Sequence, residues 1–265
     1  MKKYYSTSDG DITLYKGDCL EIMPKLNIKF DCCITDPPYG TTACKWDSVI
    51  PFEPMWKELE RLVKKEGAIC LFGQEPFSSY LRISNIYMYK YDWVWNKIMP
   101  TGMTVCNKVP MKQHEIISVF YEKSGCYFPI KTKREIEINT KNWKQDKLNS
   151  ENGKWDCHNS SLTKKIYSDK YPTSIININR ASGECNNTCR LHPTQKPVEL
   201  IEYLIKTYTN EGDIVLDFTA GSGTTGIACT NTKRKCVLIE KEEKYCDIIV
   251  KRLQDRENEL KEMLF

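Results

Sequence analysis

The chain has 265 residues, of which 40% are hydrophobic and 28% are charged, with a formal net charge of +4 at pH 7. This composition is that of a soluble globular protein and excludes a disordered or collagen-like chain. The length suffices for one large domain, or for one domain that carries an insertion.

The 13 cysteines are scattered, and no apolar run approaches the roughly 20 residues that a membrane-spanning helix needs. No apolar segment follows the first six residues, as a secretory signal would require. We therefore expect a reduced, cytoplasmic protein without a membrane partner. Cysteine and histidine residues that could bind zinc occur late in the chain, but their spacing is loose. Free structural thiols are the better interpretation of these cysteines, so no metal site is predicted. These residues are Cys157, His158, Cys185, Cys189 and His192.

The first predicted strand covers residues 11–15, and a turn at Gly17 leads from it into a short helix. Asp18 suits the N-cap of that helix, because its side chain can accept a hydrogen bond from a backbone amide. The next strand, residues 30–35, is a short apolar run typical of a buried parallel strand.

That strand ends in a proline-rich corner, Asp36-Pro37-Pro38-Tyr39, followed by Gly40. Prolines have no N–H donors, so their carbonyls project from a stiff turn beside a carboxylate and an aromatic ring. Asp36 and the Pro37 carbonyl can accept the two hydrogens of an exocyclic amine, and Tyr39 can lie flat on the ring that bears it. An ordinary strand-ending turn would also use Asp and Pro.

The following elements alternate between helix and strand and then become strands that lie closer together. The periodicity predicts helices over 52–66 and from 77 to about 83, and strands over 67–73, 89–97 and 114–121, with Pro100 as a strand breaker. This order predicts an α/β fold with a mostly parallel sheet that ends in an antiparallel hairpin. Residues 41–47 are expected to form a mobile loop near the site, in which Trp46 either stacks on a base or anchors the loop.

From about residue 125 to 189 the chain becomes polar, basic and weakly periodic. Residues 131–190 contain 12 Lys and Arg against 7 Asp and Glu, with aromatic and asparagine side chains interspersed. Such a segment suits phosphate neutralisation together with contacts to base edges. A solvated excursion without a partner is the alternative.

The last quarter of the chain contains an extended turn at 192–197, a helix from 198, and a strand at 214–217 that runs into a glycine turn. A strand at 236–239 ends at Glu240, and residues 241–264 form a charged helix. The glycine turn also fits the G-x-G-x-x-G pattern of dinucleotide-binding enzymes, so a nicotinamide-dependent enzyme stays open by local pattern alone.

Three motifs together resemble the DNA amino-methyltransferases, which methylate adenine N6 or cytosine N4 with S-adenosylmethionine. They are DPPYG at 36–40, HPTQKPVELIEYLI at 192–205 and DFTAGSGTT at 217–225, in the order of the permuted β group of that family. The resemblance implies a Rossmann-like methyltransferase sheet with an inserted target-recognition region. It assigns residues 1–124 to a catalytic half, 125–190 to target recognition and 191–265 to a cofactor-binding half of the same domain.

The resemblance also implies roles for single residues. Asp36, Pro37, Pro38 and Tyr39 are the expected catalytic residues, and the step at His114 and Glu115 is expected to line the target pocket. Lys196 is expected to pair with the carboxylate of the cofactor, and Glu240 with its ribose. The full set expected to bind the cofactor is Asp18, Cys19, Asp36, Lys196, Asp217, Phe218, Ala220, Gly221, Ser222, Gly223, Thr224, Thr225 and Glu240.

The expected activity is methylation of adenine N6 in double-stranded DNA, on a base flipped out of the duplex. Cytosine N4 is the alternative, since serine in place of Asp36 goes more often with cytosine in this family. An RNA or protein-glutamine methyltransferase more often has asparagine there, and a DNA-binding module with a decayed site would have a broken motif. Cytosine C5 chemistry needs a thiolate, and no cysteine follows a proline here. The resemblance leaves open a cognate restriction endonuclease and a homodimer.

Overall fold

The computed structural model describes residues 2–41, 48–123, 125–139, 147–148, 155–156, 166–180 and 195–262. The chain divides into two compact units, one of Met1–Phe128 with Ser174–Phe265 and one of Pro129–Thr173. The larger unit contains a sheet whose described strands are β1 (Tyr5–Ser6), β2 (Ile12–Lys16), β3 (Phe30–Thr35), β4 (Val63–Gly73), β5 (Tyr89–Thr101), β6 (Lys112–Phe120), β11 (Ile175–Asn177), β12 (Ile214–Asp217) and β13 (Lys235–Glu240).

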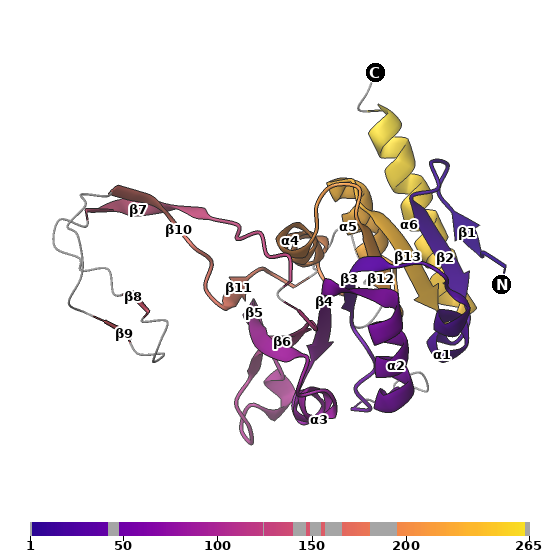
Figure 1. The fold of residues 1–265 in the computed structure, drawn as a ribbon. Coiled ribbons are helices and arrows are strands. Elements are labelled where there is room, and N and C mark those ends of the chain that lie inside the picture. Colours follow the sequence, from indigo (N-terminus) through magenta and orange to yellow (C-terminus); the bar gives the residue numbers. More distant parts are fainter. Residues whose placement is uncertain are drawn as a thin grey trace. The chain divides into compact units, whose positions relative to one another are not determined.

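Strand order in this sheet is β1-β2-β13-β12-β3-β4-β6-β5-β11 (Figure 1). The neighbours from β2 to β4 are all parallel, whereas β6 is antiparallel to both β4 and β5. The expectation of a mostly parallel sheet with an antiparallel hairpin is therefore confirmed. Parallel strands bring their carboxyl ends to one edge of a sheet, which is where α/β folds place their sites.

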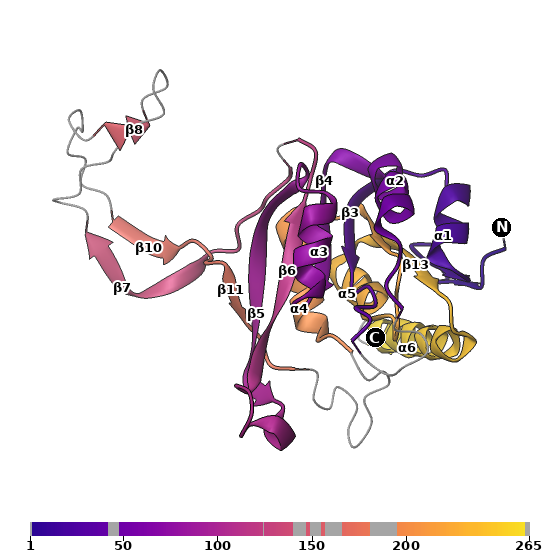
Figure 2. The same ribbon diagram turned by 90° about the horizontal axis from the view of Figure 1, so that it is seen from below.

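Helices cover both faces of the sheet, as Figures 1 and 2 show. One face carries α1 (Cys19–Ile22), the short 3-10 helix η1 (Met23–Lys25), α2 (Phe52–Leu62) and α3 (Phe77–Ser84). The other carries α4 (Val198–Tyr208), α5 (Thr224–Thr232) and α6 (Glu243–Glu262). Two apolar cores result, one on each side of the strands.

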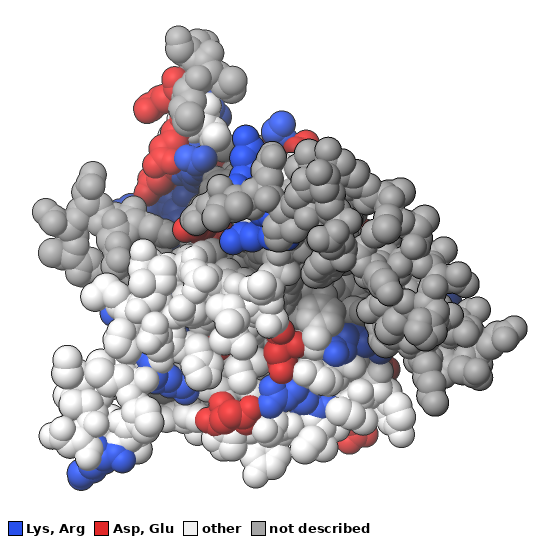
Figure 3. All heavy atoms as spheres, turned by 90° about the vertical axis from the view of Figure 1, so that its left-hand side faces the viewer, with Lys and Arg blue, Asp and Glu red and all other residues white. Residues whose placement is uncertain are grey.

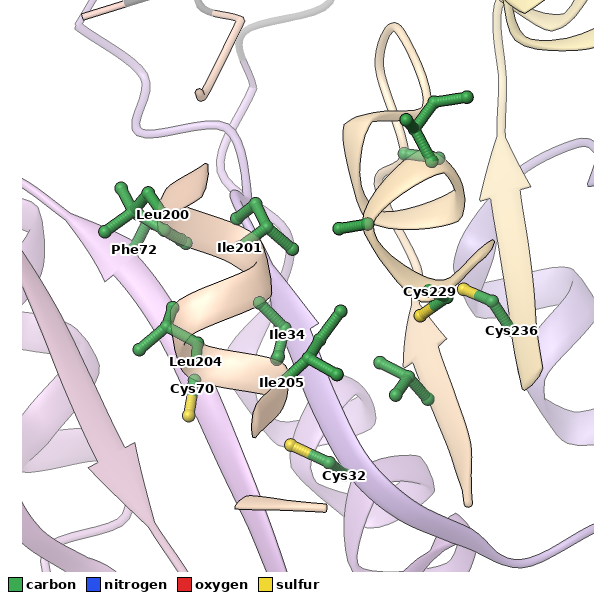
Figure 4. Close-up of a cluster of buried hydrophobic side chains, with 14 of the residues drawn as sticks. Cys32, Ile34, Cys70, Phe72, Leu200, Ile201, Leu204, Ile205, Cys229 and Cys236 are labelled. Carbon is green, nitrogen blue, oxygen red and sulfur yellow. The ribbon is translucent and has the colours of Figure 1, made fainter. Parts of the chain in front are cut away.

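The core beneath α4 shows how the sequence pattern becomes packing. Leu200 and Leu204 are fully buried on the inner face of α4, at the spacing of one helical turn. In Figure 4 this face of α4 lies over β3 and β4. Cys32 of β3 and Cys70 of β4 belong to the same core and lie beneath the helix. Leu204→Ala would leave a cavity there and cost roughly 2–5 kcal/mol of stability.

Two element boundaries differ from the sequence prediction. Helix α2 ends at Leu62 rather than residue 66, because Val63 already pairs with Phe30 in the sheet. Strand β5 continues to Thr101, beyond the proline expected to end it. Its pairing with β6 is nevertheless interrupted between Asn96 and Thr101, so Pro100 lies where no amide donor is needed.

The smaller unit is built around an antiparallel pair, β7 (Thr132–Asn139) and β10 (Ile166–Lys170). A second pair joins β8 (Lys147–Leu148) to β9 (Trp155–Asp156). Lys131 lies 4.6 Å from the ring centre of Tyr171, and both side chains are exposed. The unit falls within the predicted target-recognition region, whose role stays a prediction.

Candidate active site

A cavity of about 250 Å³ lies at the carboxyl ends of β2, β3, β12 and β13. The proline corner forms one side of it, and the glycine turn after β12 forms another. The structure thus brings into one cavity two motifs that are about 180 residues apart in the sequence. Of the residues expected to be catalytic or to bind the cofactor, Gly223 does not line the cavity, and those that do are Asp18, Cys19, Asp36, Pro37, Pro38, Tyr39, Lys196, Asp217, Phe218, Ala220, Gly221, Ser222, Thr224, Thr225 and Glu240. His114 and Glu115, which were expected to line the target pocket, do not line this cavity.

The proline corner is held in place from two sides. The Thr219 hydroxyl donates a hydrogen bond to the Asp36 carbonyl at 3.0 Å, which ties the corner to the turn after β12. The Tyr39 hydroxyl donates to Oδ1 of Asp36, and the Tyr39 ring packs at 5.1 Å between centres against Phe77. In this arrangement Tyr39 orients the carboxylate next to it.

A row of four alternating charges runs from the hairpin of β5 and β6 into the cavity. Lys97 Nζ lies 2.5 Å from Oε1 of Glu115, and Lys196 Nζ lies 3.4 Å from the other oxygen of Glu115. Lys196 also contacts Oδ2 of Asp36. The side chains of Lys97, Glu115 and Lys196 are only 8%, 9% and 8% exposed, so each charge depends on its neighbours for compensation.

The pKa values of this row follow from burial and pairing. Burial raises the pKa of Asp36, although the Lys196 ammonium opposes the shift. Burial alone would lower the pKa of Lys196, but the Asp36 and Glu115 carboxylates outweigh it and raise the value. Burial alone would likewise raise the pKa of Glu115, and the ammonium groups of Lys196 and Lys97 bring it below its usual range.

Asp217, the last residue of β12, organises the glycine turn. Its carboxylate accepts hydrogen bonds from the hydroxyls of Thr35 at 2.7 Å and Thr225 at 2.6 Å, and from the amide of Thr219 at 3.2 Å. It thereby joins the ends of β3 and β12 to the first turn of α5. Burial raises the pKa of Asp217 to about 6, despite these hydrogen bonds.

The backbone of the turn requires glycine. Gly221 and Gly223 have positive φ angles of 53° and 78°, which residues with a Cβ adopt at a cost. A Cβ on Gly223 would also lie 2.8 Å from the Ile249 side chain of α6. Gly223 therefore shapes the cavity without lining it.

Two further carboxylates stand at the ends of neighbouring strands. Glu240 accepts hydrogen bonds from the amides of Gly221 and Glu242, each at 2.8 Å, and burial raises its pKa. Asp18 caps α1 by accepting from the Leu20 amide at 2.9 Å, as the sequence predicts, and it is ion-paired with Lys241 at 3.2 Å. Both carboxylates keep lone pairs that a ligand can reach.

The cavity wall contains a cysteine that is not a nucleophile. Burial raises the pKa of the Cys19 thiol to about 12, so it stays protonated at neutral pH. Within the described ranges no group of three or more metal-ligating side chains occurs, and no helix is long and apolar enough to cross a membrane. Of the loop expected at 41–47, Thr41 lines the cavity, and residues 42–47 with Trp46 lie outside the described residues. The same is true of Cys157, His158, Cys185, Cys189 and His192.

Several residues of the site had little or no signal in the sequence. Thr35 and Thr219 join the two motifs by hydrogen bonds, but threonine in a strand or turn is unremarkable on its own. Lys97 lies far along the chain from Asp36, and nothing local connects them. Glu115 is a candidate only because the resemblance to the family places a His-Glu step beside the target pocket. Gln195 lines the cavity, and its Oε1 is buried without a hydrogen-bond partner in the described part of the chain.

Comparison with known proteins gives a consistent result. A family model described as DNA methylase matches residues 30–251. The chain is similar to the type II methyltransferase M.HinfI of Haemophilus influenzae, with 28% identity over 92% of this chain and 68% of that protein. It is also similar to the type II methyltransferase M2.MboI of Moraxella bovis, with 24% identity over 96% of this chain and 92% of that protein.

Solved structures share the fold. The complex of M1.HpyAVI with S-adenosylmethionine superimposes with a TM-score of 0.62 at 27% identity, covering 91% of this chain and 98% of that one. The cytosine-N4-specific PvuII DNA methyltransferase gives a TM-score of 0.62 at 17% identity, covering 97% and 94%, which is a likeness of fold.

Proposed function

The chain belongs to the DNA methylase family, and we propose that it methylates the N6 amino group of adenine in double-stranded DNA. The cofactor of this family is S-adenosylmethionine, and the matching type II enzymes are DNA methyltransferases of restriction-modification type. The observation that carries the proposal is the single cavity shared by the Asp36 corner and the glycine turn. One cavity of this kind can hold an amine acceptor and a cofactor side by side.

The residues of the cavity fit the cofactor. A carboxylate ligand suits the glycine turn at the start of α5, where backbone amides and the helix dipole favour negative charge. An ammonium has three donors, and among the described residues Lys196 contacts two carboxylates, which leaves a donor for the cofactor. The carboxylates of Glu240 and Asp18 can accept hydrogen bonds from hydroxyl and amine groups of the cofactor. Oε1 of Gln195 is a buried acceptor that has no hydrogen-bond donor among the described residues.

When bound, S-adenosylmethionine supplies a methyl group on a positively charged sulfur, which is already electrophilic. The chain's task is then to orient the amine and to exclude water. Asp36 and the Pro37 carbonyl would accept the two N–H groups of the amine, favouring a more tetrahedral nitrogen whose lone pair faces the methyl group. They would also stabilise the positive charge that develops on that nitrogen.

The Lys196 ammonium favours the ionised form of Asp36. An ionised carboxylate only accepts hydrogen bonds, whereas a protonated one also carries a donor, and burial works against ionisation. The Lys196 ammonium opposes that effect, and Glu115 holds Lys196 from its other side. Asp36 accepts from Tyr39 and Lys196, and a carboxylate with about four lone-pair sites can accept an amine as well.

The choice of adenine rests on Asp36 itself. In the family that the chain resembles, an aspartate at this position goes more often with adenine and a serine with cytosine N4. Cytosine N4 is the second candidate, because the same corner can hold either amine. A cognate restriction endonuclease and a homodimer stay predictions.

The test uses duplex DNA of several kilobases made by PCR, which carries no methyl groups. The protein is incubated with this DNA and with S-adenosylmethionine labelled in its methyl group, and the nucleosides are then separated. Label in N6-methyl-2′-deoxyadenosine supports the proposal, and label only in N4-methyl-2′-deoxycytidine overturns the choice of base. Binding of NAD without binding of S-adenosylhomocysteine would instead support a nicotinamide-dependent enzyme.

A further inference from the structure

The last four residues of β5 and the connection to β6, together residues 98–111, expose apolar side chains that the core does not use. We call this segment the hairpin tip. It includes the 3-10 helix η2 (Met103–Val105). The exposed fractions are 46% for Ile98, 62% for Met99, 70% for Met103, 45% for Val105 and 53% for Val109. Apolar side chains gathered at such a tip mark an interaction site more often than chance exposure does.

The hairpin tip lies at the same edge of the sheet as the cavity. Strand β4 is parallel to β3, and β6 is antiparallel to β4 and to β5, so β5 ends at the edge where β3 ends. In Figure 2 the hairpin of β5 and β6 extends beyond the rest of the sheet. The stem of the hairpin also carries Lys97 and Glu115, the outer half of the charge row that leads to Asp36.

The tip is braced rather than loosely attached. The Gln113 side chain donates to Oδ1 of Asn96 at 3.1 Å and to the Ile98 carbonyl at 3.2 Å, across the base of the tip. Ile98 has a positive φ of 62°, a conformation that is costly for a β-branched residue. Strain of this kind persists only where surrounding contacts hold it, which suits a segment kept in a binding conformation.

The one charged residue of the hairpin tip is positive, which suits a polyanion. Residues 98–111 contain Lys108 and no Asp or Glu, and Lys112 follows at the start of β6. Lys108 is exposed, whereas Lys112 contacts Oε1 of Gln74 at the base of the hairpin. In Figure 3, which views the left-hand side of Figure 1, the described surface is mostly uncharged, with Lys and Arg in small separate groups.

We propose that the hairpin tip binds duplex DNA beside the flipped base, with its apolar side chains against the bases and Lys108 near a phosphate. Apolar side chains that insert between or against base pairs are a known way of stabilising distorted duplexes, and lysine supplies the electrostatic part. The inference rests on the proposed function, since it places the duplex at the edge where the cavity lies.

An exposed cysteine in the hairpin tip, Cys106, allows a direct test on the unaltered protein. The protein is alkylated with N-ethylmaleimide with and without the PCR duplex, in the presence of S-adenosylhomocysteine, and the peptides are quantified by mass spectrometry. We expect the duplex to slow alkylation of Cys106 by about tenfold. Equal rates at Cys106 with and without DNA would overturn the proposal.

A pair of matched variants distinguishes specific DNA binding by the hairpin tip from nonspecific binding by exposed apolar side chains. Met103→Ser with Val105→Ser removes two apolar side chains of the tip, whereas Tyr87→Ser removes one that is 91% exposed at the opposite edge. We expect the tip variant to bind the duplex about tenfold more weakly, and both variants to bind S-adenosylhomocysteine as the original protein does. A tip variant that only converts a dimer to a monomer, with unchanged DNA affinity, would show that a second copy of the chain occupies the tip.

These outcomes also separate the two proposals. If the original protein methylates the duplex while the tip variant retains full affinity, only the hairpin proposal fails. If the original protein neither binds nor methylates the duplex, the proposed function fails, and the hairpin proposal fails with it.

Discussion

The ammonium of Lys196, two residues before α4, contacts Oδ2 of Asp36, the first residue after β3. This ion pair joins two of the motifs that carry the resemblance to the family. Among the described residues, the cavity wall has two cationic side chains, Lys196 and Lys241, and Lys196 is the one that contacts the expected catalytic carboxylate. Because Lys196 is also held by Glu115, the pair is the inner half of a buried charge row. The predictions below concern this row and the glycine turn that faces it.

Asp36→Ala should abolish methyl transfer while the protein still binds S-adenosylhomocysteine. The substitution removes an acceptor for the amine, and Lys196 keeps Glu115 as a partner, which it then shares with Lys97. We expect kcat to fall by at least about 10²-fold, the usual effect of losing one group that stabilises transition-state charge. Asp11→Ala, which removes an exposed partner of Lys235, is the control. Near-normal turnover of the Asp36 variant would remove this residue from its role.

Glu115→Gln should destabilise the protein, because it leaves Lys97 and Lys196 without the carboxylate between them. Breaking a buried ion pair from one side costs roughly 3 kcal/mol of unfolding free energy. Lys97→Met combined with Glu115→Gln should cost less than the sum of the single changes, since the charge left unpaired is removed as well. Urea unfolding of the two single variants and the double variant measures this coupling, and strictly additive costs would contradict the charge row.

The stability of the protein should depend on Asp217 at mildly acidic pH. The folded-state pKa of about 6 lies above 3.8, the usual pKa of an aspartate, so the folded state binds a proton more tightly than the unfolded state does. Stability attributable to this group therefore falls as pH rises from about 4 to 6, by up to about 3 kcal/mol. Asp217→Asn cannot titrate, so we expect the stability difference between the two proteins to shift in favour of the variant across that window. A difference that is independent of pH would contradict the raised pKa.

Gly223→Ala should be more damaging than Gly212→Ala, although both glycines have positive φ angles, of 78° and 85°. A Cβ on Gly212 meets no atom within 4 Å, so this variant isolates the backbone cost of about 1 kcal/mol. On Gly223 the Cβ would lie 2.8 Å from Ile249, which adds roughly 1–3 kcal/mol of overpacking. We expect only Gly223→Ala to weaken S-adenosylhomocysteine binding as well, as calorimetry can measure. Equal effects of the two substitutions would mean that the contact with α6 does not shape the turn.

Local chemistry in the sequence is sufficient to predict the sheet and the edge at which the two motifs meet. The apolar run at 30–35 becomes β3, the prolines after it end the strand, and the glycines after Asp217 form the turn, because each feature acts on its own few residues. Since the carboxyl ends of parallel strands share an edge, the two motifs could be expected to meet, and the cavity joins them. The helix boundary at Leu62 was missed, because pairing between Val63 and Phe30 overrides the helical periodicity.

Only the tertiary structure decided which charges face one another. Lys97, Glu115, Lys196 and Asp36 come from four separate segments, and no spacing in the sequence relates them. Their pairing depends on the antiparallel placement of β6 between β4 and β5. This placement brings the first half of β6 beside the end of β4. Local patterns fix what each segment becomes, whereas the energy of a buried charge depends on neighbours that only the folded chain supplies.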